Sequence, residues 1–90
     1  MADPLYRYQR YALATRMQAL STTELKAEME RHVTSGHAHF WVKPHGFGTA
    51  CTMLGRNATS TTVNTGWEYA TVARNWVKSC LKNDAPEGSK

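Results

Sequence analysis

The chain has 90 residues, a net charge of +4 at pH 7 and a hydrophobic share of 41%, with three tryptophans and four tyrosines. This composition supports one packed domain and excludes wholesale disorder, and no apolar run approaches the length of a membrane span. Two cysteines are too few for the disulfide framework of a small secreted domain, and the N-terminus has no apolar signal-peptide region. We therefore expect a soluble, cytoplasmic protein with reduced thiols.

The first helix is expected to begin at Asp3 and Pro4 and to run to Leu20, because this stretch contains no glycine and no further proline. Tyr8 and Tyr11 fall outside its main apolar stripe, so the helix is apolar over much of its circumference. This pattern suggests contact on more than one side, including contact with a second subunit in a homodimer. The stripe itself consists of Tyr6, Leu13, Met17 and Leu20.

A second helix is expected from Ser21 to about Thr34. Ser21 and Glu24 have the spacing of a capping box, in which each side chain binds the backbone N–H of the other residue. Gly36 follows the helix and is suited to a left-handed C-terminal cap. Arg31 to Trp67 then contains no acidic residue, although it holds all four histidines of the chain.

Three strands are expected within this acid-free stretch. From His37 to Lys43 the pattern has a period of two, so Ala38, Phe40 and Val42 face a core and the alternate residues face out. The outward set is His37, His39, Trp41 and Lys43. A second strand is expected at residues 49–54, a turn at Gly55–Asn57 and a third strand at residues 59–63.

The last helix is expected from about Trp67 to Lys82, with a wide apolar stripe and a ridge of basic residues on the opposite side. The stripe comprises Tyr69, Ala70, Ala73, Trp76, Val77, Cys80 and Leu81, and the ridge comprises Arg74, Lys78 and Lys82. Residues 1–83 are therefore predicted to form a single compact α+β domain. Its order is α-α-β-β-β-α, with the helices on one face of a three-stranded antiparallel sheet and residues 84–90 as a flexible tail.

Catalytic and metal chemistry find little support in the sequence. His37, His39, His45 and Cys51 are residue types that bind zinc, but no Cys-x-x-Cys or His-x-x-x-His pair accompanies them, so the question of a metal stays open. A Cys–His pair would have no nearby carboxylate to orient the imidazole, because the stretch is acid-free. We expect no enzyme activity, no cofactor and no small-molecule substrate.

Nucleic-acid binding is better supported. The expected outer sheet face interleaves aromatic and basic groups, which can stack on bases and neutralise phosphates. The candidate binding residues are His39, Trp41, Lys43, Arg56, Arg74 and Lys78. We therefore expect a small basic regulator or inhibitor whose partner is nucleic acid or an acidic protein surface, including that of a nucleic-acid-handling protein.

The order helix, three strands, helix from Glu24 to Lys82 resembles that of double-stranded RNA-binding domains. That family opens its final helix with a cluster of lysines. Here Thr65 to Tyr69 stands at the corresponding place and contains an acid and no lysine, so none of the family's binding residues is carried over.

A protein–protein inhibitor or adaptor, of the type found in mobile genetic elements, remains the alternative. An exposed Trp41 would then anchor the interface without any nucleic-acid contact. Salt separates the two possibilities, because phosphate binding releases counterions and weakens steeply as salt rises.

Overall fold

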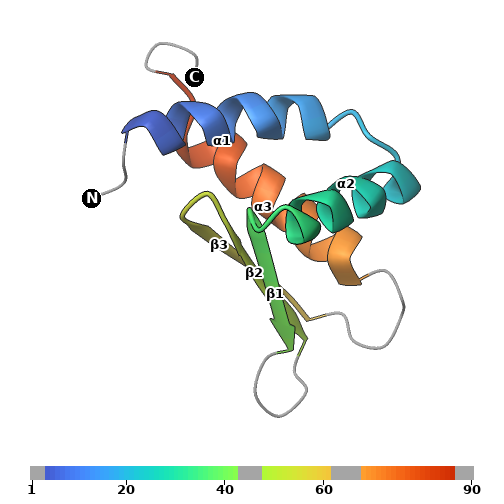
Figure 1. Cartoon of the computed structure of the whole chain (residues 1–90). Coiled ribbons are helices and arrows are strands. Elements are labelled where there is room, and N and C mark those ends of the chain that lie inside the picture. Colours follow the sequence, from blue (N-terminus) through green and yellow to red (C-terminus); the bar gives the residue numbers. More distant parts are fainter. Residues whose placement is uncertain (1–3, 43–47, 62–67, 87–90) are drawn as a thin grey trace.

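A computed structural model describes residues 4–42, 48–61 and 68–86 of the chain. Its elements follow the order α1 (Pro4–Met17), α2 (Thr22–Thr34), β1 (Ala38–Val42), β2 (Thr49–Met53), β3 (Arg56–Ser60) and α3 (Glu68–Asn83). The strands form an open antiparallel sheet against which the helices pack (Figure 1). The predicted α+β class and order of elements are confirmed.

Helix α3 holds the domain together, because it packs against β2 and β3 on one side and against α1 and α2 on the other (Figure 1). Its predicted apolar stripe is confirmed. The side chains of Ala70, Ala73, Trp76, Val77 and Cys80 are buried, and those of Tyr69 and Leu81 pack against them. At the centre, Trp76 is fully buried and its indole N–H donates to the Met53 carbonyl at 3.1 Å.

Helix α2 begins and ends as the sequence predicts. The Ser21 hydroxyl accepts from the Glu24 backbone N–H at 3.2 Å, and the Glu24 carboxylate accepts from the Ser21 N–H at 3.0 Å. These hydrogen bonds satisfy N–H groups that the first turn of a helix leaves unpaired. The hydrogen bond from the Ser21 backbone also holds the pKa of Glu24 below its ordinary value. Beyond the helix, Gly36 has a φ of 83°, as expected of a left-handed cap.

Three of the four residues in the apolar stripe predicted for the first helix reach the core: Met17 is buried, and Leu13 and Leu20 pack against the buried cluster. Tyr6 is the exception and is 44% exposed, whereas Arg10, at 2% exposed, and Ala14 are buried beside Met17. The line at positions 10, 14 and 17 therefore faces inward, and the prediction that Tyr6 belongs to the buried stripe is wrong. The sequence concealed this because a buried arginine is unusual and needs a buried partner.

The β2–β3 hairpin turns over two residues, Leu54 and Gly55, whose φ values are 51° and 79°. Positive φ at both positions is typical of a type I′ turn, which favours Asn-Gly or Gly-Gly. The predicted turn at residues 55–57 therefore lies too late, since Arg56 and Asn57 already belong to β3. The third strand is confirmed, but it spans Arg56–Ser60 instead of beginning at residue 59, and residues 62–63 of the predicted strand lie outside the described residues. Leucine at the first turn position gave no signal of a turn in the sequence.

Leu54 is held in this unfavourable backbone region by two contacts. Left-handed backbone costs a non-glycine residue about 1–2 kcal/mol. The Arg10 guanidinium donates to the Leu54 carbonyl at 2.7 Å, and the Leu54 side chain packs against the core. These contacts offset the cost and fix the position of the hairpin relative to α1.

Gly48, directly before β2, is a position where only glycine fits. Its φ is 118°, and a Cβ atom there would lie 1.9 Å from the carbonyl oxygen of Ser60. Ser60 is the last residue of β3, opposite Thr49 in the register. The glycine therefore allows β2 and β3 to pair up to the end of the sheet.

Candidate binding surface and charged clusters

The face of the sheet opposite the core carries the side chains of His39 and Trp41. Both extend from β1, where Ala38 at the start of the strand is buried and His39 and Trp41 are exposed, so the predicted alternation is confirmed at these positions. The two rings stack with centroids 5.6 Å apart and an angle of 23° between their planes. Trp41 remains 39% exposed, which leaves much of its surface available to a partner.

The neighbours of this aromatic pair are uncharged. His39 lies opposite Thr52, which lies opposite Asn57, and Thr59 occupies the next position of the same face on β3. Hydroxyl and amide groups of this kind can donate and accept hydrogen bonds. Within the described strands, this face carries no lysine or arginine. Lys43, a candidate binding residue, lies outside the described residues.

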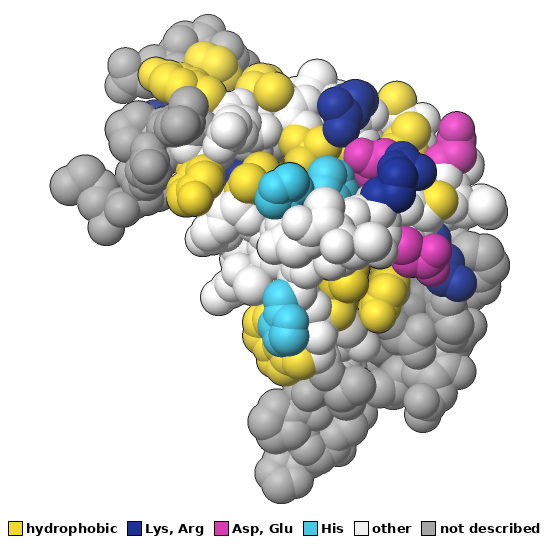
Figure 2. Space-filling model, in the orientation of Figure 1, with side chains coloured by type: hydrophobic (Ala, Val, Ile, Leu, Met, Phe, Trp, Pro, Cys, Tyr) yellow, Lys and Arg dark blue, Asp and Glu magenta, His cyan; other side chains and the backbone are white. Residues whose placement is uncertain are grey.

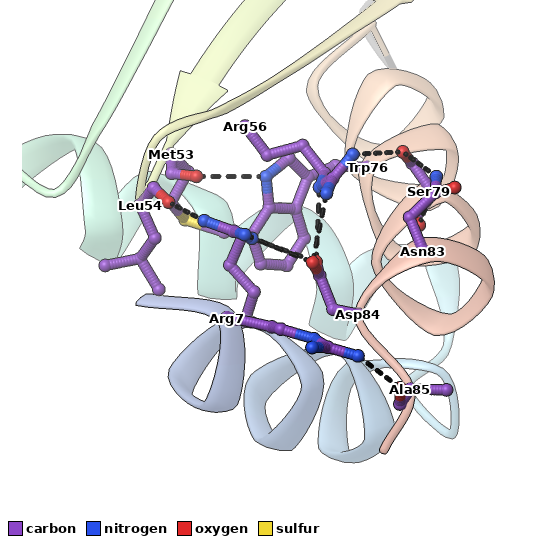
Figure 3. A network of polar contacts seen from close by, with 10 residues as sticks. Arg7, Met53, Leu54, Arg56, Trp76, Ser79, Asn83, Asp84 and Ala85 are labelled. Atoms are coloured by element: carbon purple, nitrogen blue, oxygen red, sulfur yellow. Dashed lines mark hydrogen bonds and ion pairs between the residues drawn. The ribbon is translucent and has the colours of Figure 1, made fainter. Parts of the chain in front are cut away.

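Arg56 points to the opposite, covered side of the sheet. Its guanidinium binds Asp84 through Nη2–Oδ1 at 3.0 Å and Nε–Oδ2 at 3.2 Å, and it donates to the Ser79 hydroxyl at 3.2 Å (Figure 3). Its side chain is 24% exposed. Arg56 therefore joins β3 to the end of α3 and does not share a surface with His39 and Trp41.

Asp84 is the centre of this arginine network. A second guanidinium, that of Arg10, binds it through Nε–Oδ2 at 2.9 Å and Nη2–Oδ1 at 3.1 Å, and both side chains are 3% exposed. Burial alone would raise the pKa of Asp84, but the hydrogen bonds from Arg10 and Arg56 hold it below its ordinary value. The carboxylate thus stays charged inside the domain.

The network also overturns part of the predicted tail. Asp84 and Ala85 are 3% and 8% exposed, so both belong to the packed domain, although the sequence assigned them to a flexible end. Arg7 from α1 donates to the Ala85 carbonyl at 2.9 Å (Figure 3). An acid just after a helix with a Pro and a Gly close behind is typical of a tail, and no neighbouring residue indicates that Arg10 and Arg56 pair with this one.

Arg74 and Lys78 lie on the far side of α3 from the sheet. They border a groove of about 220 Å³ whose floor includes Met17 and Leu25. Arg74 is occupied, since it donates to the Leu20 carbonyl at 3.2 Å and to the Thr22 hydroxyl at 3.4 Å, which ties α3 to the α1–α2 connection. Lys78 is exposed and makes no ion pair within the described part of the chain.

A second charged cluster surrounds Glu28 on α2. Arg16 and His32 each approach its Oε1 at 3.2 Å, and Arg31 pairs with its Oε2. The two arginine side chains are 66% and 67% exposed, whereas Glu28 is 12% exposed. Burial alone would raise the pKa of Glu28, but the hydrogen bond from Arg31 helps to keep it below its ordinary value.

The cysteines are buried and unreactive. Cys51 and Cys80 are free thiols with no exposed surface, and burial raises their pKa values to about 11 and about 12. A thiol with such a pKa is protonated at neutral pH and is a poor nucleophile. Cys51 also faces the core while His39 faces out, so these two cannot bind one metal ion. His45 lies outside the described residues.

No cluster of three or more His, Cys, Asp or Glu side chains within residues 4–42, 48–61 and 68–86 is arranged to hold a metal ion. In the same ranges, no helix is long and apolar enough to cross a membrane. The structure defines an α+β domain with one open sheet face. Comparisons with protein-family models, with curated proteins and with solved structures find no match to this chain.

The structure therefore brings together His39 and Trp41, and separately Arg74 and Lys78, while Arg56 is held elsewhere by Asp84. The six candidate residues do not form one site in the described part of the chain. The candidate binding surface is the open sheet face, defined by His39, Trp41, Thr52, Asn57 and Thr59.

Proposed function

We propose that this chain is a small basic binding module, a regulator or inhibitor, that engages single-stranded nucleic acid through its open sheet face. The observation that carries the proposal is the exposed, stacked pair of His39 and Trp41 on β1. Flat exposed aromatic rings on a sheet provide a platform on which bases stack.

The uncharged neighbours support the same reading. Thr52 and Asn57 follow His39 across the sheet, and Thr59 follows Trp41 beyond the buried Ala50. Bases stacked on the rings would therefore meet groups able to form hydrogen bonds with their edges. The net charge of +4 provides the long-range attraction to phosphates. On the proposal, the charge of Lys43, two residues after Trp41 in the sequence, contributes to this attraction.

Fluorescence anisotropy with a labelled single-stranded oligonucleotide of about 12 nucleotides tests this proposal. Because a base stacked on an aromatic ring contributes about 1–3 kcal/mol, Trp41→Ala should weaken binding by about 5- to 150-fold. Trp41→Phe keeps a ring and should retain most of the affinity. Tyr8→Ala is the matched control, since Tyr8 is an aromatic side chain on α1 that is 63% exposed.

Two results would contradict the proposal. One is the absence of oligonucleotide binding by the wild type. The other is an equal loss in Trp41→Ala and Tyr8→Ala, because binding would then not depend on the sheet face. A salt series between about 50 and 200 mM adds a second criterion, since contacts to phosphates make affinity fall steeply over this range.

A protein partner, such as a nucleic-acid-handling protein, is the second candidate. The observation that favours it is the absence of lysine and arginine from the open face within the described strands, because aromatic anchors surrounded by uncharged polar groups suit a protein interface. Binding to a purified partner should then be lost in Trp41→Ala but change little with salt.

A further inference from the structure

A cleft of about 380 Å³ lies between α1, the end of α2 and the β2–β3 turn. Its apolar side is formed by Leu13 and Leu54, and its polar side by Gln9, Arg16, His32 and His37. Small-molecule sites commonly have volumes of about 300–1,000 Å³ and combine an apolar wall with a few convergent polar groups. The cleft has the size and the composition of such a site.

Figure 2 shows the exterior of this region, with two histidine side chains side by side. Hydrophobic atoms border them on one side and a group of acidic and basic side chains on the other. The rings of His32 and His37 have centroids 6.4 Å apart. An apolar ligand with one charged end would thus find both kinds of contact within a short distance.

The strained turn is an independent indication that the wall of the cleft forms part of a binding site. Leu54 has a φ of 51° at a position that favours asparagine or glycine, and its side chain forms part of the cleft. Strained backbone positions concentrate at binding and catalytic sites. The leucine supplies an apolar surface that the residues preferred by the turn would not provide.

Hydrogen bonds within the protein fix one nitrogen of each imidazole. The Ser35 hydroxyl donates to the His32 carbonyl at 3.1 Å and contacts His37 Nδ1 at 3.1 Å. Both contacts are satisfied only when His37 Nδ1 carries a hydrogen and donates. His32 Nε2 donates to the Glu28 carboxylate at 3.2 Å. His37 Nε2 then has no hydrogen-bond partner among the described residues.

The charges beside the cleft favour an anion. Glu28 is one carboxylate facing the guanidinium groups of Arg16 and Arg31, which leaves an excess of one positive charge before either histidine is protonated. Arg16 is 66% exposed and has further N–H groups beyond its contact with Glu28. A guanidinium can bind a carboxylate through two parallel hydrogen bonds.

We propose that this cleft binds a small amphipathic carboxylate, namely a carboxylic acid whose apolar body is an aryl ring or a short alkyl chain. Arg16 holds the carboxylate, His37 Nε2 adds a hydrogen bond when protonated, and Leu13 and Leu54 enclose the apolar body. This site is separate from the open sheet face, so it does not depend on the function proposed above.

Isothermal titration with hydrocinnamate tests the proposal, with hydrocinnamyl alcohol as the uncharged counterpart and acetate as the counterpart without an apolar body. Because a hydrogen bond to a charged group is lost in the alcohol and the apolar contact is lost in acetate, each should bind at least about tenfold more weakly. No binding of hydrocinnamate, or equal binding of the alcohol, would overturn the proposal.

Arg16→Gln and Arg31→Gln form a matched pair, since both arginines are similarly exposed and both contact Glu28, but only Arg16 borders the cleft. Arg16→Gln should weaken hydrocinnamate binding by about tenfold, and Arg31→Gln should leave it within about twofold. Equal effects of the two substitutions would refute a direct contact with Arg16.

Leu54→Asn separates loss of the site from loss of the fold. Asparagine is favoured at this turn position, so Leu54→Asn should still fold and should give a circular dichroism spectrum like that of the wild type. Hydrocinnamate binding should nevertheless fall by about fivefold or more, because part of the apolar wall is gone. A folded Leu54→Asn with unchanged affinity for hydrocinnamate would contradict the proposed site. Trp41→Ala is the control and should leave that affinity unchanged.

Discussion

Asp84 and Glu28 are two carboxylates that each face two arginines, but they differ in burial. At Asp84 the acid and Arg10 are 3% exposed and Arg56 is 24% exposed. At Glu28 the acid is 12% exposed, whereas both arginines are about two-thirds exposed. The first cluster joins α1, β3 and the end of α3, and the second joins α1 and α2 at the surface.

The difference teaches that the same pairing has different consequences in the two environments. Water solvates the exposed arginines around Glu28, so hydration still stabilises their positive charges when the carboxylate is removed. Water does not solvate Arg10 in this way, because its guanidinium is buried and without its counter-ion retains the full cost of desolvation. Asp84 should therefore be essential to the fold, and Glu28 should be nearly dispensable.

The largest effect is expected from Asp84→Asn. This change keeps the size of the side chain but leaves the Arg10 guanidinium buried without an anion, which should reduce the free energy of unfolding by about 3–5 kcal/mol. Because domains have total stabilities of about 5–15 kcal/mol, the variant should be marginally stable. Urea denaturation measures the change, and a loss below about 1 kcal/mol would show that the network contributes little.

The next largest effect is the loss of folding stability at low pH. The pKa of Asp84 is lower in the folded protein than in the unfolded chain, where an aspartate titrates near pH 3.9. The stabilisation from this shift is therefore complete above about pH 5 and is lost as the pH falls through the folded pKa.

Urea midpoints measured between about pH 5 and pH 2 should fall less steeply in Asp84→Asn than in the wild type. Glu28→Gln should keep more of the wild-type slope, although the pKa of Glu28 is also lowered. If the two substitutions flatten the profile equally, burial does not distinguish the two clusters.

The smallest effect is expected from Glu28→Gln at neutral pH. Its partners are exposed arginines and one part-buried histidine, so the free energy of unfolding should change by about 0–1 kcal/mol. The same urea measurement applies. A loss comparable with that of Asp84→Asn would show that the surface cluster is as important to the fold as the buried one.

Short-range patterns in the sequence predicted much of the fold. The capping box of Ser21 and Glu24 and the glycine at position 36 placed α2, because caps involve residues only a few positions apart. The spacing of Trp76 and Cys80 placed the buried face of α3, and alternation along β1 assigned Ala38 to the core and Trp41 to the surface. In each case the cause lies within one element.

Contacts between distant residues were beyond the sequence patterns. Arg10 and Asp84 are 74 positions apart, and neither has a neighbour that reveals the pairing. Arg56 looked like a free cation in a turn, but β3 begins there and turns its side chain toward Asp84. For the candidate site, the sequence identified His39 and Trp41 as outward residues, whereas it gave no sign of the cleft between α1, α2 and Leu54.

The sequence by itself determined which segments are helices and strands, their order and most of their apolar faces, because these depend on periodicity and on local caps. Only the tertiary structure decided which charges are buried and where the hairpin turns. These features depend on pairs of groups from different elements, and a charged residue can be buried only where the fold places an opposite charge beside it.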